Sequence, residues 1–326
     1  MIEQGRLCVV LFCALLLAPC AGTQTADAQA GATFSETGSI KPYLGRWDLT
    51  VTTPTEERPS WIDLSERHGQ VEGLMVGFWG HATPTGTVQL KNGEIEFTAP
   101  TDEGFDEGTI FKGKLAGGQL AGTATSPKGV SWHWTGQRAP ALQRKSAPHW
   151  GEPVRLFNGK DLSGWKFADP DHAGVWSVEE GTLVKNGSGS ELISVPELAD
   201  FKLHVEFNCG PMANSGVYLR GRYEVQIETD SASEPPDQRM GAVYGFLTPE
   251  PALPHTPNVW QTYDVTLLGR TLTLVHDGKT VIDHKEIPGI TGGALDSHEG
   301  LPGPVYLQGS EVGRVAFRNI LVTPAE

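Results

Sequence analysis

Apolar and polar side chains alternate every second residue through most of this chain, and this period constrains its fold more than any other feature. The segments FKLHVEF at 201–207 and YEVQIE at 223–228 show the alternation most clearly. A period of two residues is that of a β-strand, whose side chains point to opposite faces in turn. The 40 glycines and 23 prolines favour many short strands joined by turns. We therefore predict an all-β protein.

The first structured region, residues 31–140, is predicted to be a small antiparallel barrel. Its alternating segments are short and are separated by turn signals such as Asn92-Gly93, which suits a tight hairpin. The opening Gly45-Arg46-Trp47 resembles the Gly-x-Trp start of lipocalin-like barrels. Trp47, Phe78 and Trp79 would then line the barrel interior, either as a filled core or as a lipophilic pocket.

The second structured region, residues 153–326, follows a linker predicted at 141–152. The linker contains Pro, Lys and Arg and shows no periodicity. Beyond the linker the alternating segments are longer, and Asp277-Gly278 is a typical hairpin turn. Strands of this length with irregular loops between them predict a sandwich of two packed antiparallel sheets.

Residues 1–30 are predicted to be a signal peptide. Arg6 precedes an apolar run at Leu7–Ala18 that is too short to span a bilayer, and Ala28-Gln29-Ala30 matches an A-x-A cleavage site. The rival prediction is a lipoprotein signal that ends at Cys20. Either signal leads to a periplasmic or secreted protein, which would be attached to a membrane only if Cys20 is lipidated.

The charge balance limits the partners that this chain can bind. It has 39 acidic and 25 basic residues and a formal net charge of -14, so nucleic acids and anionic lipid surfaces would be repelled. A neutral or cationic ligand fits better. Cys209 is the single cysteine beyond the predicted leader, which excludes a disulfide framework and a cysteine-based zinc cluster.

Polar side chains of unusual composition gather on one face of three predicted strands. Counting alternate positions, these residues are His204, Glu206, Tyr218, Arg220, Glu224, Gln226 and Glu228. Ordinary solvation of an exposed sheet face is the simpler explanation. The mixture also suits the binding of a polyol, and it would form one concave wall if the strands are neighbours. Asn214-Ser215-Gly216 and Trp260 would add polar and stacking contacts at the rim of that wall.

Residues 154–323 resemble the 3-keto-disaccharide hydrolase domain family. Blocks in the same order carry the resemblance: LFNGKDLSGW at 156–165, NSGVYLRGRYEVQI at 214–227, MGAVYG at 240–245, WQTYDVTLLGRTLTLVHDGK at 260–279, GITGGALDSHEGLPGPVYLQG at 289–309 and FRNI at 317–320. The resemblance implies a concanavalin A-like jelly-roll sandwich. It does not extend to the first structured region.

The resemblance also implies an enzyme that cleaves glycosides already oxidised to a ketone at C3, with an oligosaccharide or another glycoside as its ligand. A C3 ketone acidifies the proton on C2, so a carboxylate base can remove it and the enolate can expel the C1 substituent before water adds. Such a site needs a base, a positive group or metal ion at the enolate oxygen, and a proton donor for the leaving oxygen.

Carried over to this chain, the resemblance suggests roles for individual residues. Glu224, in the YEVQ block, is expected to be the base or a metal ligand, and Glu206 and His298 are further catalytic candidates. Arg220 or a divalent ion would stabilise the oxyanion. A divalent metal ion would be held among Glu224, Glu228 and Asp230, although the chain has no EF-hand-like spacing. The candidates for sugar binding are Asn214, Arg220, Gln226, His204, Tyr244, Trp260 and Gln308.

This chain departs from the family pattern in two places. Many relatives carry a histidine-glycine pair where this chain has Ser310–Gly313, and an aspartate after VQI where it has Glu228-Thr229-Asp230. If either position is essential, Glu311 and Asp230 must substitute for the missing residues, or the activity differs or is lost.

Two other functions stay open. An ordinary glycosidase needs two carboxyl groups about 5 to 5.5 Å or about 6.5 to 9.5 Å apart. Glu224 and Glu228 cannot supply such a pair because four residues along a strand span about 13 Å, whereas Glu206 and Glu224 could do so across strands. The chain could instead be a non-catalytic glycan-binding module, since a fold does not fix a function.

Overall fold

The computed structural model describes residues 39–101, 104–144, 146–228 and 234–326, which all belong to one compact unit. Twenty-two strands and three short 3-10 turns, Lys41–Tyr43, Pro170–Val175 and Pro236–Gln238, form the regular structure of these residues, so the all-β prediction is confirmed. None of the described residues belongs to a helix that is long and apolar enough to cross a bilayer. The predicted leader at 1–30, with Cys20, lies outside the described residues.

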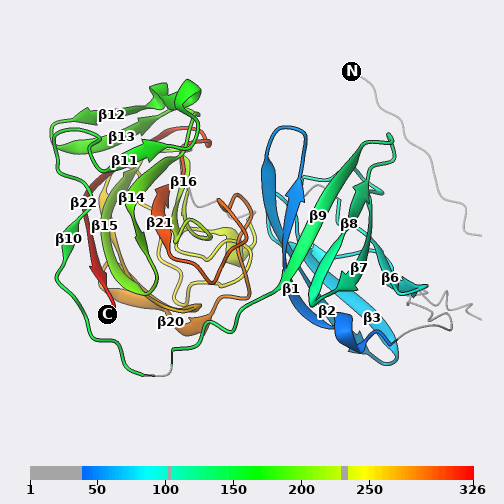
Figure 1. The fold of residues 1–326 in the computed structure, drawn as a ribbon. Helices are drawn as coiled ribbons and strands as arrows, with labels where there is room; N and C mark the ends of the chain where they lie inside the picture. The colour runs from blue at the N-terminus through cyan, green and yellow to red at the C-terminus, as the bar shows by residue number, and fades with distance from the viewer. Residues whose placement is uncertain (1–38, 102–103, 145, 229–233) are drawn as a thin grey trace, which may run out of the picture. The chain divides into compact units, whose positions relative to one another are not determined.

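The N-terminal strands form one antiparallel sheet of nine strands, in the order β4-β3-β2-β1-β9-β8-β7-β6-β5. The sheet is strongly curled (Figure 1). Its interior is a filled core, in which the stacked rings of Phe97 and Phe111 lie 5.1 Å apart beside Trp47 and Trp134. The strands are β1 (Gly45–Thr52), β2 (Glu57–Arg67), β3 (Gln70–Val76), β4 (Ala82–Pro84), β5 (Gln89–Lys91), β6 (Glu94–Thr98), β7 (Ile110–Ala116), β8 (Gln119–Thr125) and β9 (Ser131–Arg138).

Trp79 does not belong to this core, although the sequence predicted that it would line the interior with Trp47 and Phe78. Its side chain is 49% exposed, whereas Trp47 and Phe78 are buried in the core. Strand β3 ends at Val76, and the residues up to Gly80 bend away from it. Beyond the end of a strand, alternation no longer determines where a side chain points.

Residues from 154 onward form two further antiparallel sheets. The eight-stranded sheet has the order β12-β13-β22-β15-β18-β19-β20, with β10 paired to β22, and the five-stranded sheet has the order β11-β14-β21-β16-β17. The eight-stranded sheet consists of β10 (Val154–Arg155), β12 (Trp176–Glu179), β13 (Thr182–Asn186), β15 (Phe201–Cys209), β18 (Trp260–Leu268), β19 (Thr271–His276), β20 (Lys279–Glu286) and β22 (Arg314–Pro324). The five-stranded sheet consists of β11 (Trp165–Phe167), β14 (Leu192–Leu198), β16 (Asn214–Leu219), β17 (Tyr223–Glu228) and β21 (Gly303–Leu307).

These two sheets pack face to face, because apolar side chains from both belong to one buried cluster. Alternation along β15, β16 and β17 predicted which side chains point inward, and all of them lie in this cluster. They are Phe201, Leu203, Val205, Phe207, Val217, Leu219, Tyr223, Val225 and Ile227. Each large apolar side chain removed from water in this way contributes about 1.5–3 kcal/mol to stability.

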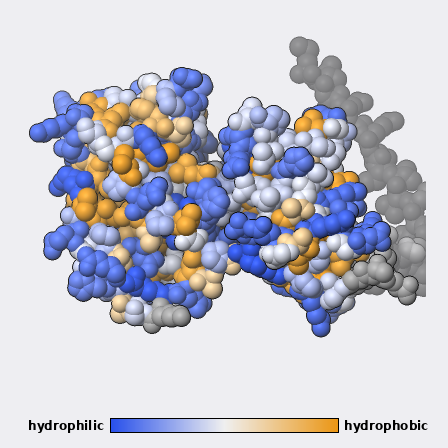
Figure 2. All heavy atoms as spheres, viewed as in Figure 1, coloured by the Kyte–Doolittle hydropathy of each residue, from blue (hydrophilic) through white to orange (hydrophobic). Residues whose placement is uncertain are grey.

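Loops of the C-terminal part contact the nine-stranded sheet directly. Trp61 of β2 donates from Nε1 to the carbonyl of Ile290 at 2.9 Å, and its ring belongs to the buried cluster of the two C-terminal sheets. The buried carboxylate of Glu299 accepts hydrogen bonds from Tyr223, Arg46 and Arg270. Apart from such contacts, hydrophilic and hydrophobic residues are interspersed on the visible face of the molecule (Figure 2).

Candidate functional site

A cavity of about 580 Å³ lies on the face of the five-stranded sheet that points away from the eight-stranded sheet. Pockets of this size hold small molecules such as sugars. The strands β16, β17 and β21 supply its floor, and loops from both the C-terminal and the N-terminal parts add residues to its walls. The floor residues are Asn214, Tyr218, Glu224, Gln226 and Tyr306, with Gln308 directly after β21.

Strand register explains why these side chains meet. Tyr218 of β16 stands directly opposite Glu224 of β17, and both project from the face that the inward-facing apolar residues leave free. That face is not solvated: the exposed fraction is 4% for Glu224, 2% for Gln226 and 9% for Glu228. Solvation of an open sheet face, the simpler explanation offered by the sequence, is therefore wrong for β17.

The Tyr218 hydroxyl lies within hydrogen-bond distance of two oxygen atoms at the floor of the cavity. The Tyr218 hydroxyl lies 2.9 Å from Glu224 Oε2 and 2.9 Å from the carbonyl oxygen of Gly292. A tyrosine hydroxyl has one proton, and a carbonyl can only accept. The one Tyr218 proton is therefore available to two acceptors, Glu224 Oε2 and the carbonyl oxygen of Gly292.

The electrostatics of the cavity favour the neutral form of Glu224. Burial raises the pKa of Glu224 to about 8, the hydrogen bond from Tyr218 opposes this rise, and the negative charge of Glu311 adds to it. Desolvation penalises a charged carboxylate far more than a neutral carboxylic acid. Glu224 is therefore mostly a neutral acid at pH 7.

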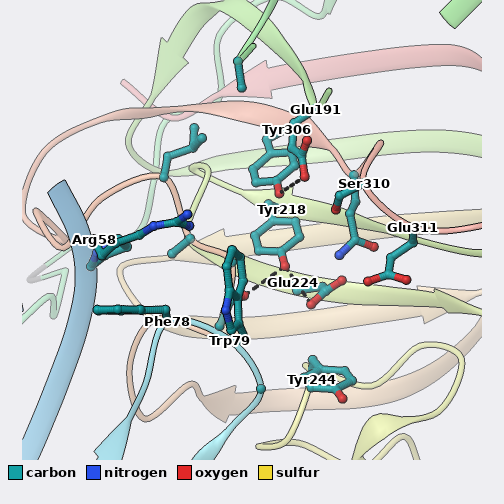
Figure 3. Close-up of a pocket in the computed structure, with 18 of the residues that line it drawn as sticks. Arg58, Phe78, Trp79, Glu191, Tyr218, Glu224, Tyr244, Tyr306, Ser310 and Glu311 are labelled. Atoms are coloured by element: carbon teal, nitrogen blue, oxygen red, sulfur yellow. Dashed lines mark hydrogen bonds between the residues drawn. The ribbon is translucent and has the colours of Figure 1, made fainter. Parts of the chain in front are cut away.

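A second carboxyl group lies in the same cavity. The rings of Tyr218 and Tyr306 stack with their centroids 4.1 Å apart, and the Tyr306 hydroxyl donates to Glu191 Oε1 at 3.2 Å. Burial also raises the pKa of Glu191. Figure 3 shows Glu311 directed toward Glu224 from the segment that follows β21. The cavity thus contains the buried carboxyl group of Glu224 and the less buried, charged carboxylate of Glu311.

Three amide oxygens in the cavity lack hydrogen-bond donors. Asn214 Oδ1, Gln226 Oε1 and Gln308 Oε1 are buried and have no partner among the described residues. An unpaired buried acceptor costs about 1–3 kcal/mol. Hydroxyl groups of a bound polyol can donate to all three. These residues and Tyr244, which also lines the cavity, were predicted from the sequence as sugar-binding residues.

Strand pairing separates two of the predicted site residues from Glu224. Strand β15 lies in the eight-stranded sheet, so His204 and Glu206 do not share a wall with β17. His204 instead contacts Asp264 at 2.7 Å, and Glu206 accepts from Arg318 at 2.6 Å and from Asn319 at 2.7 Å. The expected single wall, and with it a cross-strand pair of Glu206 and Glu224, is not formed.

Arg220, Trp260 and His298 also lie outside this cavity. Strand β16 ends at Leu219, and Arg220 begins the turn with a φ of 54°, so its guanidinium points instead toward Tyr223 and the carbonyls of Gly269 and Glu299. Trp260 packs under Arg318 with the guanidinium carbon 3.9 Å from the ring centroid. His298 is exposed and lines a different cavity, beside Asp48.

The metal-binding prediction finds no support among the residues that the structure describes. They contain no group of three or more His, Cys, Asp and Glu side chains arranged to hold a metal ion. The Glu228 side chain contacts the amide of Gln226 at 3.3 Å, and Asp230 lies outside the described residues. Glu311, which the sequence suggested as a substitute for the missing family residues, does line the cavity.

Sequence reasoning did not assign several residues of the cavity, among them Tyr306, Glu191, Arg58 and Trp79. Tyr306 stands two positions before Gln308, so alternation along GPVYLQG could have identified it. Glu191 comes just before β14 and carried no distinguishing signal. Arg58 and Trp79 belong to the N-terminal part, and only the folded structure brings them to the cavity.

Comparison with known proteins extends this description. A family model described as the 3-keto-alpha-glucoside-1,2-lyase-like domain matches residues 152–323. No curated protein matches the chain.

Solved structures give distant similarities to about half of the chain. Two structures of a candidate glycosyl hydrolase from Parabacteroides distasonis ATCC 8503 cover 53% and 55% of this chain and 94% and 92% of their own, with 20% and 24% identity and TM-scores of 0.45 and 0.44. A carbohydrate binding module from Bacillus subtilis covers 48% of this chain and 93% of its own, with 15% identity and a TM-score of 0.34. The family assignment depends on the family model.

Proposed function

The chain belongs to the 3-keto-alpha-glucoside-1,2-lyase-like domain family, and from this premise we propose that it is an exported enzyme that cleaves 3-keto-glycosides by elimination or hydrolysis. A carbohydrate-related function follows from the family itself. The finer proposal rests on one observation: a buried carboxyl group with a raised pKa, Glu224, on the floor of a cavity that has three unpaired acceptors for sugar hydroxyls.

The geometry favours Glu224 as the proton donor. The sequence suggested that Glu224 is the base, but a carboxyl group with a pKa of about 8 keeps its proton at pH 7. Two carboxyl groups whose environments differ in this way usually divide the roles of acid and base. We assign the base to Glu311, whose charge contributes to the raised pKa of Glu224 and which is less buried.

The reaction then balances within the cavity. Glu311 takes the proton from C2 of the 3-keto ring, and the electrons of that C–H bond form the double bond between C1 and C2 as the bond from C1 to the leaving oxygen breaks. Glu224 gives its proton to the leaving oxygen. Water that later adds to C1 converts elimination into hydrolysis. Asn214, Gln226 and Gln308 would hold the ring through its hydroxyl groups.

Two substrates with different leaving groups can test whether Glu224 acts as a general acid or as a base. In Glu224→Gln, cleavage of a 3-keto-disaccharide should fall by about 10²–10⁴-fold, the usual contribution of general acid catalysis. Cleavage of a 4-nitrophenyl 3-keto-glucoside should fall less than about tenfold, because this phenolate leaves without a proton. NMR analysis of products from both substrates measures these rates.

Two controls complete the test. Glu311→Gln should slow both substrates to a similar extent, because loss of the C2 base does not depend on the leaving group. The unoxidised parent glycosides should not be cleaved. Equal losses for both substrates in Glu224→Gln would contradict the acid role, and saturable sugar binding without turnover of any 3-keto-glycoside would make the chain a glycan-binding module.

Export and domain organisation remain parts of the proposal. We propose that residues 1–30 direct the protein to the periplasm or the exterior, with a lipid anchor if Cys20 is the modified residue. We also propose that residues 31–140 are a lipocalin-like barrel domain, joined by a linker at 141–152 to the jelly-roll domain at 153–326.

A further inference from the structure

Trp79 presents an unusual surface to the cavity. About half of its side chain is exposed, and the residue lines the cavity although it belongs to the N-terminal part of the chain. The guanidinium carbon of Arg58 lies 4.6 Å from the centroid of the indole ring. The other tryptophans of the described residues are buried or partly buried. An exposed aromatic ring at a cavity is typical of a ligand-binding surface.

The segment that carries Trp79 is held in place by its backbone. Gly292 N donates to the carbonyl of Gly80 at 3.1 Å, and Gly293 N donates to the carbonyl of Phe78 at 3.0 Å. A Cβ atom at Gly292 would lie 2.3 Å from the carbonyl carbon of Trp79, so glycine is needed for this approach. The carbonyl of the same Gly292 accepts the hydrogen bond from Tyr218. Trp79 is thus held in a fixed relation to the acid, Glu224.

We infer that Trp79 and Arg58, which lie outside the residues that the family model matches, form the subsite that receives the leaving pyranose ring of a disaccharide substrate. This inference rests on the proposed function. The apolar C–H face of a pyranose stacks on an indole ring, and Arg58 can donate to its hydroxyl groups. Figure 3 shows Trp79 and Arg58 on the side of the cavity that faces Tyr218 and Glu224.

The assignment to the leaving ring follows from the division of the cavity. The three unpaired amide oxygens come from the same floor as Glu224 and suit the oxidised ring, on which the proton transfers take place. The wall from the N-terminal part offers an aromatic face and a cation, paired with Glu56 at 2.6 Å, and no acid of the proposed reaction. It therefore binds without taking part in the chemistry.

The test compares ring-shaped and small leaving groups in the full chain. For Trp79→Ala, KM for a 3-keto-disaccharide should rise about tenfold or more, while KM for methyl 3-keto-glucoside and kcat for both substrates stay within about twofold of wild type. Trp79→Phe should give an intermediate KM because it keeps a ring. The matched control is Trp260→Ala, which removes another tryptophan under an arginine but outside the cavity, and it should change neither KM.

The remaining outcomes are also decisive. Equal changes for both substrates, or no change, in a Trp79→Ala protein whose melting temperature matches wild type would overturn the subsite. If wild type cleaves neither substrate, the proposed function fails, and calorimetry with the unoxidised disaccharide tests the subsite by itself. At least tenfold weaker binding in Trp79→Ala would then support it, whereas equal binding, or no binding to wild type, would overturn it.

Discussion

At the scale of single residues, Tyr218 influences the pKa of the buried carboxyl group of Glu224. One hydroxyl group lies within hydrogen-bond distance of two oxygen atoms, and its bond to Glu224 lowers the pKa of that carboxyl group against the larger effect of burial. Tyr218 is itself fully buried and stacked on Tyr306. It therefore acts as a positioning residue, because it fixes the acid without being assigned a bond to the substrate.

Tyr218→Phe should move the pKa of Glu224 further upward, because the group that favours its charged form is lost. The fall in cleavage rate at high pH, where Glu224 loses its proton, should then shift to higher pH in the rate profile for a 3-keto-disaccharide. Tyr306→Phe is the control, since that hydroxyl contacts Glu191 and not Glu224. A shift to lower pH in Tyr218→Phe would contradict this account.

At the scale of elements, the β16–β17 hairpin places the acid across its neighbouring strand. Gly216 of β16 stands opposite Gln226, one cross-strand pair away from Tyr218 and Glu224. A Cβ atom at Gly216 would lie 2.4 Å from Glu224 Oε1 and 2.9 Å from its Cγ. The absence of a side chain at this position lets Glu224 lie over β16.

Gly216→Ala should lower kcat for a 3-keto-disaccharide on the order of 10²-fold, because the added methyl group displaces the Glu224 carboxyl group by an ångström or more. Thermal unfolding should show a folded protein. Gly174→Ala is the matched control, since a Cβ atom at Gly174 meets no atom within 4 Å. Wild-type kcat in Gly216→Ala would show that the position of Glu224 over β16 is not needed for cleavage.

At the scale of the whole molecule, buried carboxyl groups make stability depend on pH. The pKa is raised to about 8 for Glu224 and to about 6 for Asp48, in both cases mainly by burial. Between the pKa values of the unfolded and folded states, the folded protein binds more protons than the unfolded chain. The stability that these two groups contribute is therefore lost as the pH rises from about 4 to about 8.

Glu224→Gln should remove part of this pH dependence. Relative to wild type, the free energy of unfolding of the variant should increase by up to about 1.4 kcal/mol per pH unit between pH 5 and 7.5, because the variant has no proton to lose there. Urea unfolding at several pH values measures this difference. Glu197→Gln, at an exposed position of β14, should run parallel to wild type. A parallel curve for Glu224→Gln would mean that Glu224 titrates alike in the folded and unfolded states.

Much of this arrangement could be predicted from the sequence. Alternation separates Tyr223, Val225 and Ile227 from Glu224 and Gln226, and the structure has these two sets on opposite faces of β17. The same reasoning correctly predicted an all-β protein. It worked where a side chain's direction depends on its own strand alone.

The failures occur where direction depends on partners far along the chain. Alternation shows that Glu206 and Glu224 each point away from a core, but not that β15 and β17 belong to different sheets. It does not show where β16 ends, so Arg220 was assigned to the wall although it lies in a turn. It also cannot bring Trp79 to a cavity built from C-terminal strands, because that depends on how loops pack in the folded chain.

Gly292 joins the two halves of the cavity through a single peptide group on each side of its Cα: its N–H holds the segment of Trp79, and its carbonyl holds Tyr218. In evolution, the preference for a leaving group and the proton transfer can therefore change independently of each other. Substitutions at Trp79 or Arg58 can adapt a lineage to new leaving groups while the acid stays unchanged. Gly292 constrains both features, since any side chain at this position would disturb the segment of Trp79 and the carbonyl that accepts from Tyr218.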